Sequence, residues 1–311
     1  MKHFQKAKKY VIIGGTPLER VFNFSGYERF SHEVHFDMAR HSTIGCGGKA
    51  RVAFCPHSVA EMKALLSKLD GDKIPYRVVG NMSNVLPPDE ELQIPLIRTK
   101  NLNGITVTDG AFVYAGVTSG ALLSMCKRNG KSGVEFLYGI PCALGGALFM
   151  NAGVGGAYIG EIVNEVLVYQ NGKTKLLSQK DCGYAYKHSV FMEEGGVILG
   201  ASLRLKNATE EEIQKNEDVF KAKRAHLPKG KSMGCVFKNP VGLRAGELIE
   251  KSGLKGLRVG GAFVSETHAN FIINDNAATA GDVKTLISLI KNAVQSQYGI
   301  RLEEEIRYIP F

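Results

Sequence analysis

Hydrophobic residues recur at helical spacing in two long segments of the chain. The first segment begins at Ser58–Glu61, where a serine followed three residues later by a glutamate is typical of a helix N-terminus. The apolar side chains behind it fall on one face of the predicted helix, and they are Met62, Leu65, Leu66 and Leu69. A second helix is predicted over residues 281–297 and ends at Gly299, and its apolar face consists of Val283, Leu286, Ile287, Ile290 and Val294.

Shorter patterns predict three further helices. Residues 118–129 form a short helix that ends at Gly130, and residues 245–251 form another that ends at Gly253. Between them, residues 207–224 form a polar helix that crosses over or links two parts of the chain.

Runs rich in β-forming residues predict strands among these helices, at residues 10–13, 76–79, 196–205 and 301–308. Asp109-Gly110 and Asn171-Gly172 each separate two such runs and are typical of hairpin turns. Strands, hairpins and helices mixed in this way predict an α+β fold, and the change in character after the polar helix places a domain boundary near residue 207.

Composition narrows the possible partners of the chain. The 311 residues carry a net charge of +9, which favours anions such as nucleotides and phosphorylated metabolites. Lysine and arginine are spread along the chain without an arginine-rich stripe, which argues against a nucleic-acid partner. The six cysteines form no CxxC pair and no zinc-site spacing, so we expect reduced thiols and no metal. Because the longest apolar stretch, 140–150, is too short for a membrane span, we expect a cytoplasmic protein with no membrane partner.

Two glycine-rich segments are candidate ligand sites. Gly80–Asn84 follows a predicted strand and offers consecutive backbone N–H groups with two amide side chains, which suits a pyrophosphate; an ordinary turn is the alternative. Residues 138–153 place many glycines in an apolar sequence, which favours a flat or phosphorylated ligand against bare backbone; a tightly packed helix contact is the alternative. By contrast, Val11–Gly15 lacks the third glycine and the acidic residue of a dinucleotide-binding motif.

The segment Gly234–Pro240 is the most informative one for chemistry. It places the Cys235 thiol, a lysine and an amide on a tight turn bounded by a glycine and a proline. A thiol held on a rigid turn can deliver a proton to one chosen carbon of a bound substrate, and a plain surface loop is the alternative.

Three further segments gather polar residues. Residues 186–191 set a cation among aromatic residues, and residues 268–274 place polar groups before a buried strand. Residues 302–306 carry three acids, of which strand alternation points Glu303 and Glu305 to the same face. Each of these segments can also be explained without a function, as the end of a surface strand or as a solvent-exposed charged face.

Taken together and in this order, these segments resemble the UDP-N-acetylenolpyruvoylglucosamine reductase (MurB) family. The resemblance runs from His41 to Glu305, and its most specific motifs are GIP…GGA…MNAG, GCVFKNP, AGELIEKSGLKG and HANFIIN. It implies a variable segment at 1–40, a two-lobed FAD-binding domain of the PCMH/MurB type at 41–206, and an α+β substrate-binding domain at 207–311. Lys187 and Cys235 are too close in sequence to admit the long substrate-closing segment of some members, so the chain resembles the compact type.

The resemblance also implies the cofactors FAD and NADPH and the residues that hold FAD. The pyrophosphate would be held by Gly80, Asn81, Ser83 and Asn84. The flavin would be lined by Gly139, Ile140, Pro141, Gly145, Gly146, Asn151 and Gly153.

The implied reaction is the reduction of UDP-N-acetylglucosamine enolpyruvate to UDP-N-acetylmuramate in peptidoglycan precursor synthesis. Hydride would pass from NADPH through FAD to C3 of the enolpyruvyl group. Lys187 and Glu305 would stabilise the negative charge that develops, and Cys235 would protonate C2. The residues implied in substrate binding are Tyr186, Lys238, Asn239, His268 and Asn270.

Four positions depart from the pattern of the family. Cys235 stands where serine is usual, and a thiol, with a reference pKa of about 8.5, is a stronger acid than an alcohol. Lys187 stands where arginine is usual and replaces a planar fork with a point charge. Gly155 stands where a tyrosine is frequent, for which Tyr158 is a candidate substitute, and Met82 replaces a loop glycine.

Two alternative functions stay open from the sequence. An oxidase that shares the FAD domain would often attach its flavin covalently through histidine or cysteine. An inactive nucleotide-binding homologue would fit the changes at 187, 155 and 82. We expect a monomer.

Overall fold

A four-stranded sheet forms the first lobe of the molecule. The computed structural model describes residues 22–309, so the strand predicted at 10–13 lies outside the described part. The sheet has the order β1-β2-β5-β3, with β1 antiparallel to β2 and the other neighbours parallel. Its strands and the short helix after β1 are β1 (His32–Asp37), α1 (Met38–His41), β2 (Lys49–Phe54), β5 (Leu96–Arg98) and β3 (Arg77–Val79).

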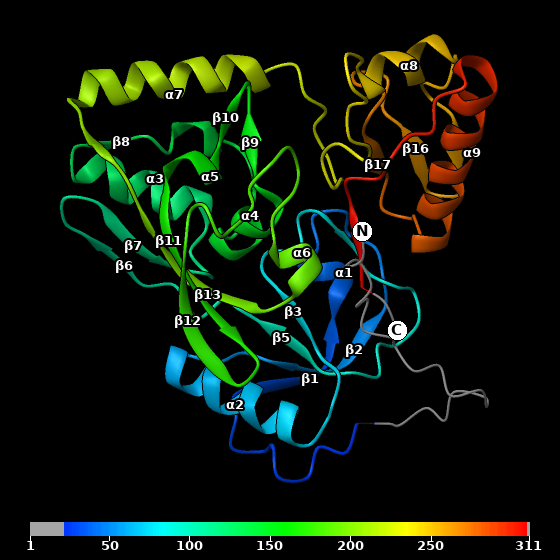
Figure 1. Ribbon diagram of the computed structural model, residues 1–311. Helices are drawn as coiled ribbons and strands as arrows, with labels where there is room; N and C mark the ends of the chain where they lie inside the picture. Colours follow the sequence, from blue (N-terminus) through cyan, green and yellow to red (C-terminus); the bar gives the residue numbers. More distant parts are fainter. Residues whose placement is uncertain (1–21, 310–311) are drawn as a thin grey trace, which may run out of the picture.

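Helix α2 (Val59–Gly71) packs on this sheet, as the hydrophobic spacing predicts (Figure 1). The Ser58 hydroxyl accepts a hydrogen bond from the Glu61 N–H at 3.1 Å, which satisfies one free donor of the first turn. The Glu61 carboxylate accepts hydrogen bonds from the N–H groups of His57 and Ser31, and not from the N–H of Ser58 as a complete capping box would require. The four predicted apolar side chains are fully buried, so the predicted face is confirmed.

The described part of residues 1–40, from residue 22 on, belongs to the first lobe. Strand β1 forms an edge of the sheet, and Phe22, Tyr27 and Phe30 are buried in its core. A division at residue 40 therefore cuts through the ladder between β1 and β2.

A five-stranded antiparallel sheet with the order β12-β11-β13-β7-β6 forms the second lobe. Both predicted hairpins are confirmed, since β6 and β7 flank Asp109-Gly110 and β11 and β12 flank Asn171-Gly172. The φ angles of +53° and +76° at Asn171 and Gly172 suit a two-residue hairpin turn. The strands are β6 (Ile105–Val107), β7 (Ala111–Tyr114), β11 (Val163–Gln170), β12 (Lys173–Ser178) and β13 (Val197–Leu203).

Helices cover one side of this second sheet (Figure 1). The predicted helix at 118–129 is α3 (Ser119–Arg128), which Thr118 caps. The others are η1 (Glu135–Leu137), α4 (Leu144–Met150), α5 (Ile159–Ile162) and α6 (Phe191–Glu194), and two small ladders join β8 (Lys131–Ser132) to β14 (Lys206–Asn207) and β9 (Gly153–Val154) to β10 (Ala157–Tyr158).

The predicted polar helix is α7 (Glu210–Arg224), and it lies along the second lobe. The ring of Phe220 packs edge-on against that of Phe136 at 6.5 Å, and the Lys127 ammonium donates to Gln214. A structural boundary thus falls after α7 and not near residue 207.

The C-terminal domain packs two helices against a three-stranded sheet with the order β15-β16-β17. The helices are confirmed as α8 (Ala245–Lys251) and α9 (Ala280–Tyr298), and the strands are β15 (Arg258–Val259), β16 (Ala262–Val264) and β17 (Ile272–Asn274). Asp89 of the first lobe accepts the N–H groups of Ala280 and Gly281 at the N-terminus of α9, at 2.7 and 2.9 Å. This contact fixes the domain against the first lobe.

The end of the chain returns from the C-terminal domain into the first lobe (Figure 1). Strand β18 (Arg307–Tyr308) pairs in parallel with β4 (Val85–Leu86). The strand predicted at 301–308 was therefore too long, since Glu304 makes only an isolated bridge to Phe237 before β18. No helix within residues 22–309 is long and apolar enough to cross a membrane.

Candidate active site

A cavity of ≈ 1610 Å³ opens where the two lobes and the C-terminal domain meet. The first lobe contributes Gly80–Asn84 to its wall, and the second lobe contributes Gly139–Ala143 and Lys187. Cys235 and Glu305 line it from the C-terminal part of the chain. All three residues predicted to carry the chemistry therefore face one space, although they are far apart in the sequence.

The turn that carries Cys235 is held from two sides. The Val236 N–H donates to the Asn270 carbonyl at 2.8 Å, and the Asn270 side chain both accepts from the Phe237 N–H and donates to the Phe237 carbonyl at 2.9 Å. On the other side, the Glu305 N–H donates to the Val236 carbonyl at 2.8 Å. These bonds position Cys235 and Glu305 together.

Lys187 and Glu305 form an ion pair across the junction between the second lobe and the end of the chain. The Lys187 Nζ lies 2.7 Å from the Glu305 Oε1, and only 18% and 12% of the two side chains are exposed. Burial alone would lower the pKa of Lys187, but the charge and hydrogen bond of Glu305 outweigh it and raise this pKa above its ordinary value. Lys187 therefore stays charged at neutral pH.

The Cys235 thiol is a weaker acid than the sequence alone suggests. Burial and then the negative charge of Glu305 raise the pKa of Cys235 to about 11. The charges of Lys187 and Arg224 act in the opposite direction without cancelling this rise. The thiol stays protonated at neutral pH, which is the state that a proton donor needs.

The glycines of the cavity wall differ in what they contribute. A Cβ on Gly146 or on Gly234 would meet no atom within 4 Å, so these positions leave the backbone open. A Cβ on Gly145 would lie 3.1 Å from that of Ala115, so this glycine also serves a close packing contact. Gly146 thus leaves bare backbone in the segment at 139–147, whereas a Cβ on Gly80 would lie 3.0 Å from that of Ala143, so the loop at 80–84 packs closely against this segment. Together the two segments form a glycine-containing wall that fits a flat, phosphorylated cofactor such as FAD.

Met82 keeps a glycine-like backbone in this wall. Its φ of +50° lies in the left-handed region, while its side chain is buried in the core of the first lobe. The exchange of glycine for methionine therefore adds backbone strain without filling the cavity.

Six of the residues predicted to bind ligands are absent from the cavity wall: Asn151, Tyr186, Lys238, Asn239, His268 and Asn270. The Asn151 amide instead donates to the Ala185 carbonyl at 2.8 Å and accepts from the Gly160 N–H at 3.0 Å. Asn270 holds the turn of Cys235, as described above. The side chains of Asn151 and Asn270 thus hold the backbone around the site.

The other four lie around the outside of this support. The Tyr186 hydroxyl accepts from the Asn239 N–H at 3.3 Å, which links the second lobe to the C-terminal domain. Lys238 pairs with the exposed carboxylate of Glu303, so Glu303 and Glu305 have different surroundings despite the predicted alternation. His268 is half-buried with its ring against Phe271.

Sequence reasoning missed two cations at the end of α7, Lys223 and Arg224, both of which line the cavity. The Arg224 guanidinium donates to the Gly139 carbonyl at 3.0 Å. The Lys223 side chain fills the space beside Gly155, because a Cβ there would lie 2.5 Å from its Nζ. No sequence motif distinguishes these two residues, because both lie in the polar helix that the sequence predicts to be a solvent-exposed linker.

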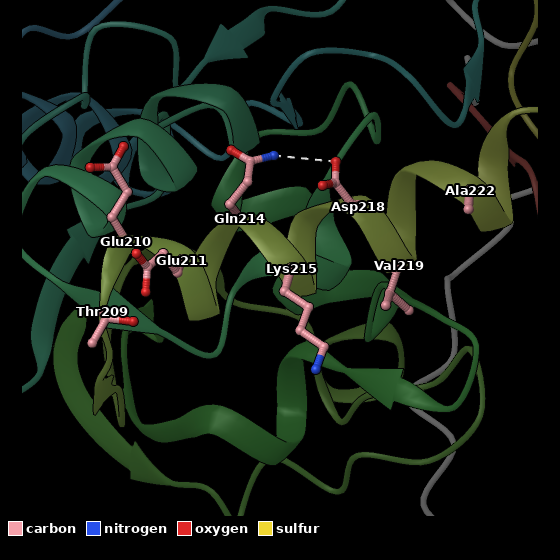
Figure 2. A pocket seen from close by; sticks show the side chains of 8 residues that line it. All are labelled: Thr209, Glu210, Glu211, Gln214, Lys215, Asp218, Val219 and Ala222. Carbon is pink, nitrogen blue, oxygen red and sulfur yellow. Dashed lines mark hydrogen bonds between the residues drawn. The ribbon is translucent and has the colours of Figure 1, made fainter.

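A second, open hollow runs along the outer face of α7 (Figure 2). All of its lining residues, from Thr209 to Ala222, belong to the cap or body of that one helix. Its polar side chains interact locally, as when the Gln214 amide donates to Asp218. None of the predicted site residues lies there.

Comparison with known proteins decides between the candidate families. A family model of the FAD binding domain matches residues 50–175, and a model of the UDP-N-acetylenolpyruvoylglucosamine reductase C-terminal domain matches residues 225–309. The enzyme of that name from Carboxydothermus hydrogenoformans is 37% identical over 277 residues, which cover 88% of this chain and 92% of the relative. The chain belongs to the UDP-N-acetylenolpyruvoylglucosamine reductase family.

Other members of the family agree with this assignment. The UDP-N-acetylenolpyruvoylglucosamine reductase of Geobacter metallireducens is 38% identical over 276 residues, which cover 88% of this chain and 92% of that protein. The crystal structure of the Thermus caldophilus member (MurB) superposes with a TM-score of 0.78 at 34% identity, covering 91% of this chain and 99% of that chain. The predicted α+β fold with a two-lobed FAD-binding domain is confirmed, and the protein is an FAD-dependent oxidoreductase.

Proposed function

We propose that this member of the family reduces UDP-N-acetylglucosamine enolpyruvate to UDP-N-acetylmuramate in peptidoglycan precursor synthesis. The observation that carries the proposal is the convergence of a protonated thiol, a buried cation and a carboxylate on one cavity with a glycine-rich wall. The relatives named above support the substrate, because their names state reduction of this enolpyruvyl sugar nucleotide.

The residues of the cavity divide between cofactor and substrate. We assign the FAD pyrophosphate to the loop at 80–84 and the flavin to the glycine-rich wall at 139–153. When bound, FAD supplies to C3 of the enolpyruvyl group the hydride that it takes from NADPH. The UDP-sugar then lies toward the C-terminal domain, with Tyr186, Lys238, Asn239 and His268 at its border.

Addition of a hydride to C3 leaves negative charge on C2 and its carboxylate. The buried Lys187 ammonium stabilises this charge, and Glu305 holds the ammonium in place. Cys235 donates its S–H proton to C2, which completes the addition of H⁻ and H⁺ across the double bond, and solvent then returns a proton to the thiolate. NADPH and a UDP-sugar as substrates support a cytoplasmic location, and we expect a monomer.

The test of this proposal uses the purified full-length protein. It is expected to be yellow and to oxidise NADPH only when UDP-N-acetylglucosamine enolpyruvate is supplied, as measured by absorbance. A colourless protein that FAD cannot reconstitute, or tight binding of the UDP-sugar without turnover, would contradict the proposal. Flavin that stays with acid-precipitated protein would indicate an oxidase with covalent flavin instead.

Lys187→Arg is expected to retain at least the activity of the unchanged enzyme. A guanidinium can keep the contact to Glu305 at 2.7 Å and present a second donor to the developing charge. Steady-state kinetics with saturating NADPH measure the effect. A loss of more than about tenfold would show that the cavity is built around the shorter lysine, since tenfold corresponds to roughly 1.4 kcal/mol of barrier.

A further inference from the structure

The Arg224 guanidinium is a cation without a carboxylate partner at the reacting end of the cavity. It is half-buried at the C-terminus of α7, and within residues 22–309 it makes no ion pair. Its one hydrogen bond to the protein, from Nη2 to the Gly139 carbonyl, uses one of five N–H donors. A half-buried charge of this kind favours an anionic ligand.

The backbone beside Arg224 makes room for this arrangement. Gly139 has a φ of +71°, and a Cβ added there would lie 3.0 Å from the Arg224 Nε. Glycine at this position therefore lets the guanidinium lie along the cavity wall with its remaining donors free.

The other cations that line the cavity differ from Arg224 in partner or in place. Lys187 is paired with Glu305. Arg77, which like Arg224 donates to one backbone carbonyl, belongs to β3 of the first lobe and is not among the charges that act on the Cys235 thiol. Lys223 lies over the ring of Phe220, and Arg307 lies over the ring of Phe149. Arg224 is the guanidinium of the wall whose charge acts on the Cys235 thiol, and burial lowers the pKa of Arg224 without removing its charge at neutral pH.

We propose that Arg224 holds the carboxylate of the enolpyruvyl group in a bidentate grip. This inference rests on the proposed function, in which Cys235 protonates C2. The carboxylate is bonded directly to C2. Any ligand that places C2 next to the Cys235 thiol therefore also places its carboxylate in the same part of the cavity. A planar guanidinium matches that carboxylate with two parallel N–H donors. Arg224 thus supplies the fork that is missing at position 187, where lysine is a point charge.

A pair of ligands that differ by the carboxylate tests this role. UDP-N-acetylmuramate carries it and UDP-N-acetylglucosamine lacks it, while both share the UDP-sugar. In Arg224→Gln loaded with FAD, we expect UDP-N-acetylmuramate to bind about 10- to 100-fold more weakly, as calorimetry measures, and UDP-N-acetylglucosamine to change less than about threefold.

Two further variants control for charge and for folding. Lys223→Gln removes a positive charge from the same cavity, and we expect it to change both affinities by the same factor. Arg224→Lys keeps the charge but loses the fork, so a smaller loss confined to UDP-N-acetylmuramate is expected, and this variant carries the comparison if Arg224→Gln does not fold.

Three outcomes would overturn the inference: equal weakening of both ligands, no weakening of either, or loss of FAD from the folded variants, which would assign Arg224 to the cofactor. Failure of the proposed function has a different signature. In that case the unchanged, FAD-loaded protein itself would bind neither ligand or would fail to oxidise NADPH with the enolpyruvyl substrate.

Discussion

Cys235→Ala is expected to slow reduction of the enolpyruvyl substrate by a factor of about 10² to 10⁴, the usual contribution of a positioned general acid. Reduction of the flavin by NADPH requires no proton from this thiol and is expected to keep its rate. Stopped-flow absorbance measures the two half-reactions separately. The alanine leaves the hydrogen bonds of the turn in place, because all of them involve the backbone or Asn270.

Cys235→Ser provides the matched control for this prediction. A hydroxyl of similar size can donate the same proton, so we expect substantial activity to return. In the unchanged enzyme the thiol pKa of about 11 keeps the donor protonated through neutral pH, so activity is not expected to fall from its ionisation below about pH 10. Equal slowing of both half-reactions by Cys235→Ala would show that the residue is structural.

The same pKa predicts how the thiol reacts with alkylating reagents. Only the thiolate is nucleophilic, and a group with a pKa near 11 carries very little thiolate at pH 7. Oxidation also proceeds through the thiolate, so Cys235 is expected to be alkylated and oxidised more slowly than an exposed thiol with an ordinary pKa.

Elements with strong local signals were predicted well from the sequence. Helix α2 has both a cap at Ser58 and a complete apolar face, and the hairpin at Asn171-Gly172 has residues that tolerate positive φ. Strand β1 lacks any such pattern, since within it only Phe36 is buried, and it forms because β2 offers a partner. The extent of the strand at 301–308 also depends on long-range contacts, those of Glu304 with Phe237 and of β18 with β4.

The site shows a similar division between local and long-range information. Family motifs led to Lys187, Cys235 and Glu305, and the fold brings these three together. The motifs do not say which polar side chains face the cavity. Asn270, for example, lies in a motif of the family, but its amide is hydrogen-bonded to the backbone of Phe237. Arg224 was missed because its importance arises from a contact with Gly139, which is 85 residues away in the sequence.

Glu305→Gln is expected to lower the rate of substrate reduction by about 10² to 10³ and to destabilise the protein by about 3 kcal/mol. The rate falls because the Lys187 ammonium loses the carboxylate that holds it 2.7 Å away and is free to turn from the reacting carbon. The stability falls because removal of one partner leaves a largely buried charge without compensation. Half-reaction kinetics and chemical unfolding measure the two effects.

The stability of the unchanged protein and that of Glu305→Gln are expected to change in opposite directions as the pH rises. In the unchanged protein the folded-state pKa of Lys187 is raised above its ordinary value of 10.5, so the stability from the pair is fully present below pH 10.5 and is lost as the pH rises through the raised pKa. In Glu305→Gln, burial acts on Lys187 without the opposing carboxylate and lowers its pKa. The stability of the variant is therefore expected to rise with pH as it approaches 10.5, which reverses the trend.

Glu303→Gln is the matched control, since Glu303 lies two residues away and pairs with Lys238 while 72% of its side chain is exposed. An exposed pair of this kind contributes about 0–1 kcal/mol, so this control is expected to change stability slightly and to leave the pH trend as it is. If Glu305→Gln behaves like Glu303→Gln in stability and in rate, the pair with Lys187 neither supports the fold nor positions the cation. A reversed pH trend with a normal rate would instead assign the pair to stability alone, and catalysis would then rest on Cys235 and the remaining cations of the cavity.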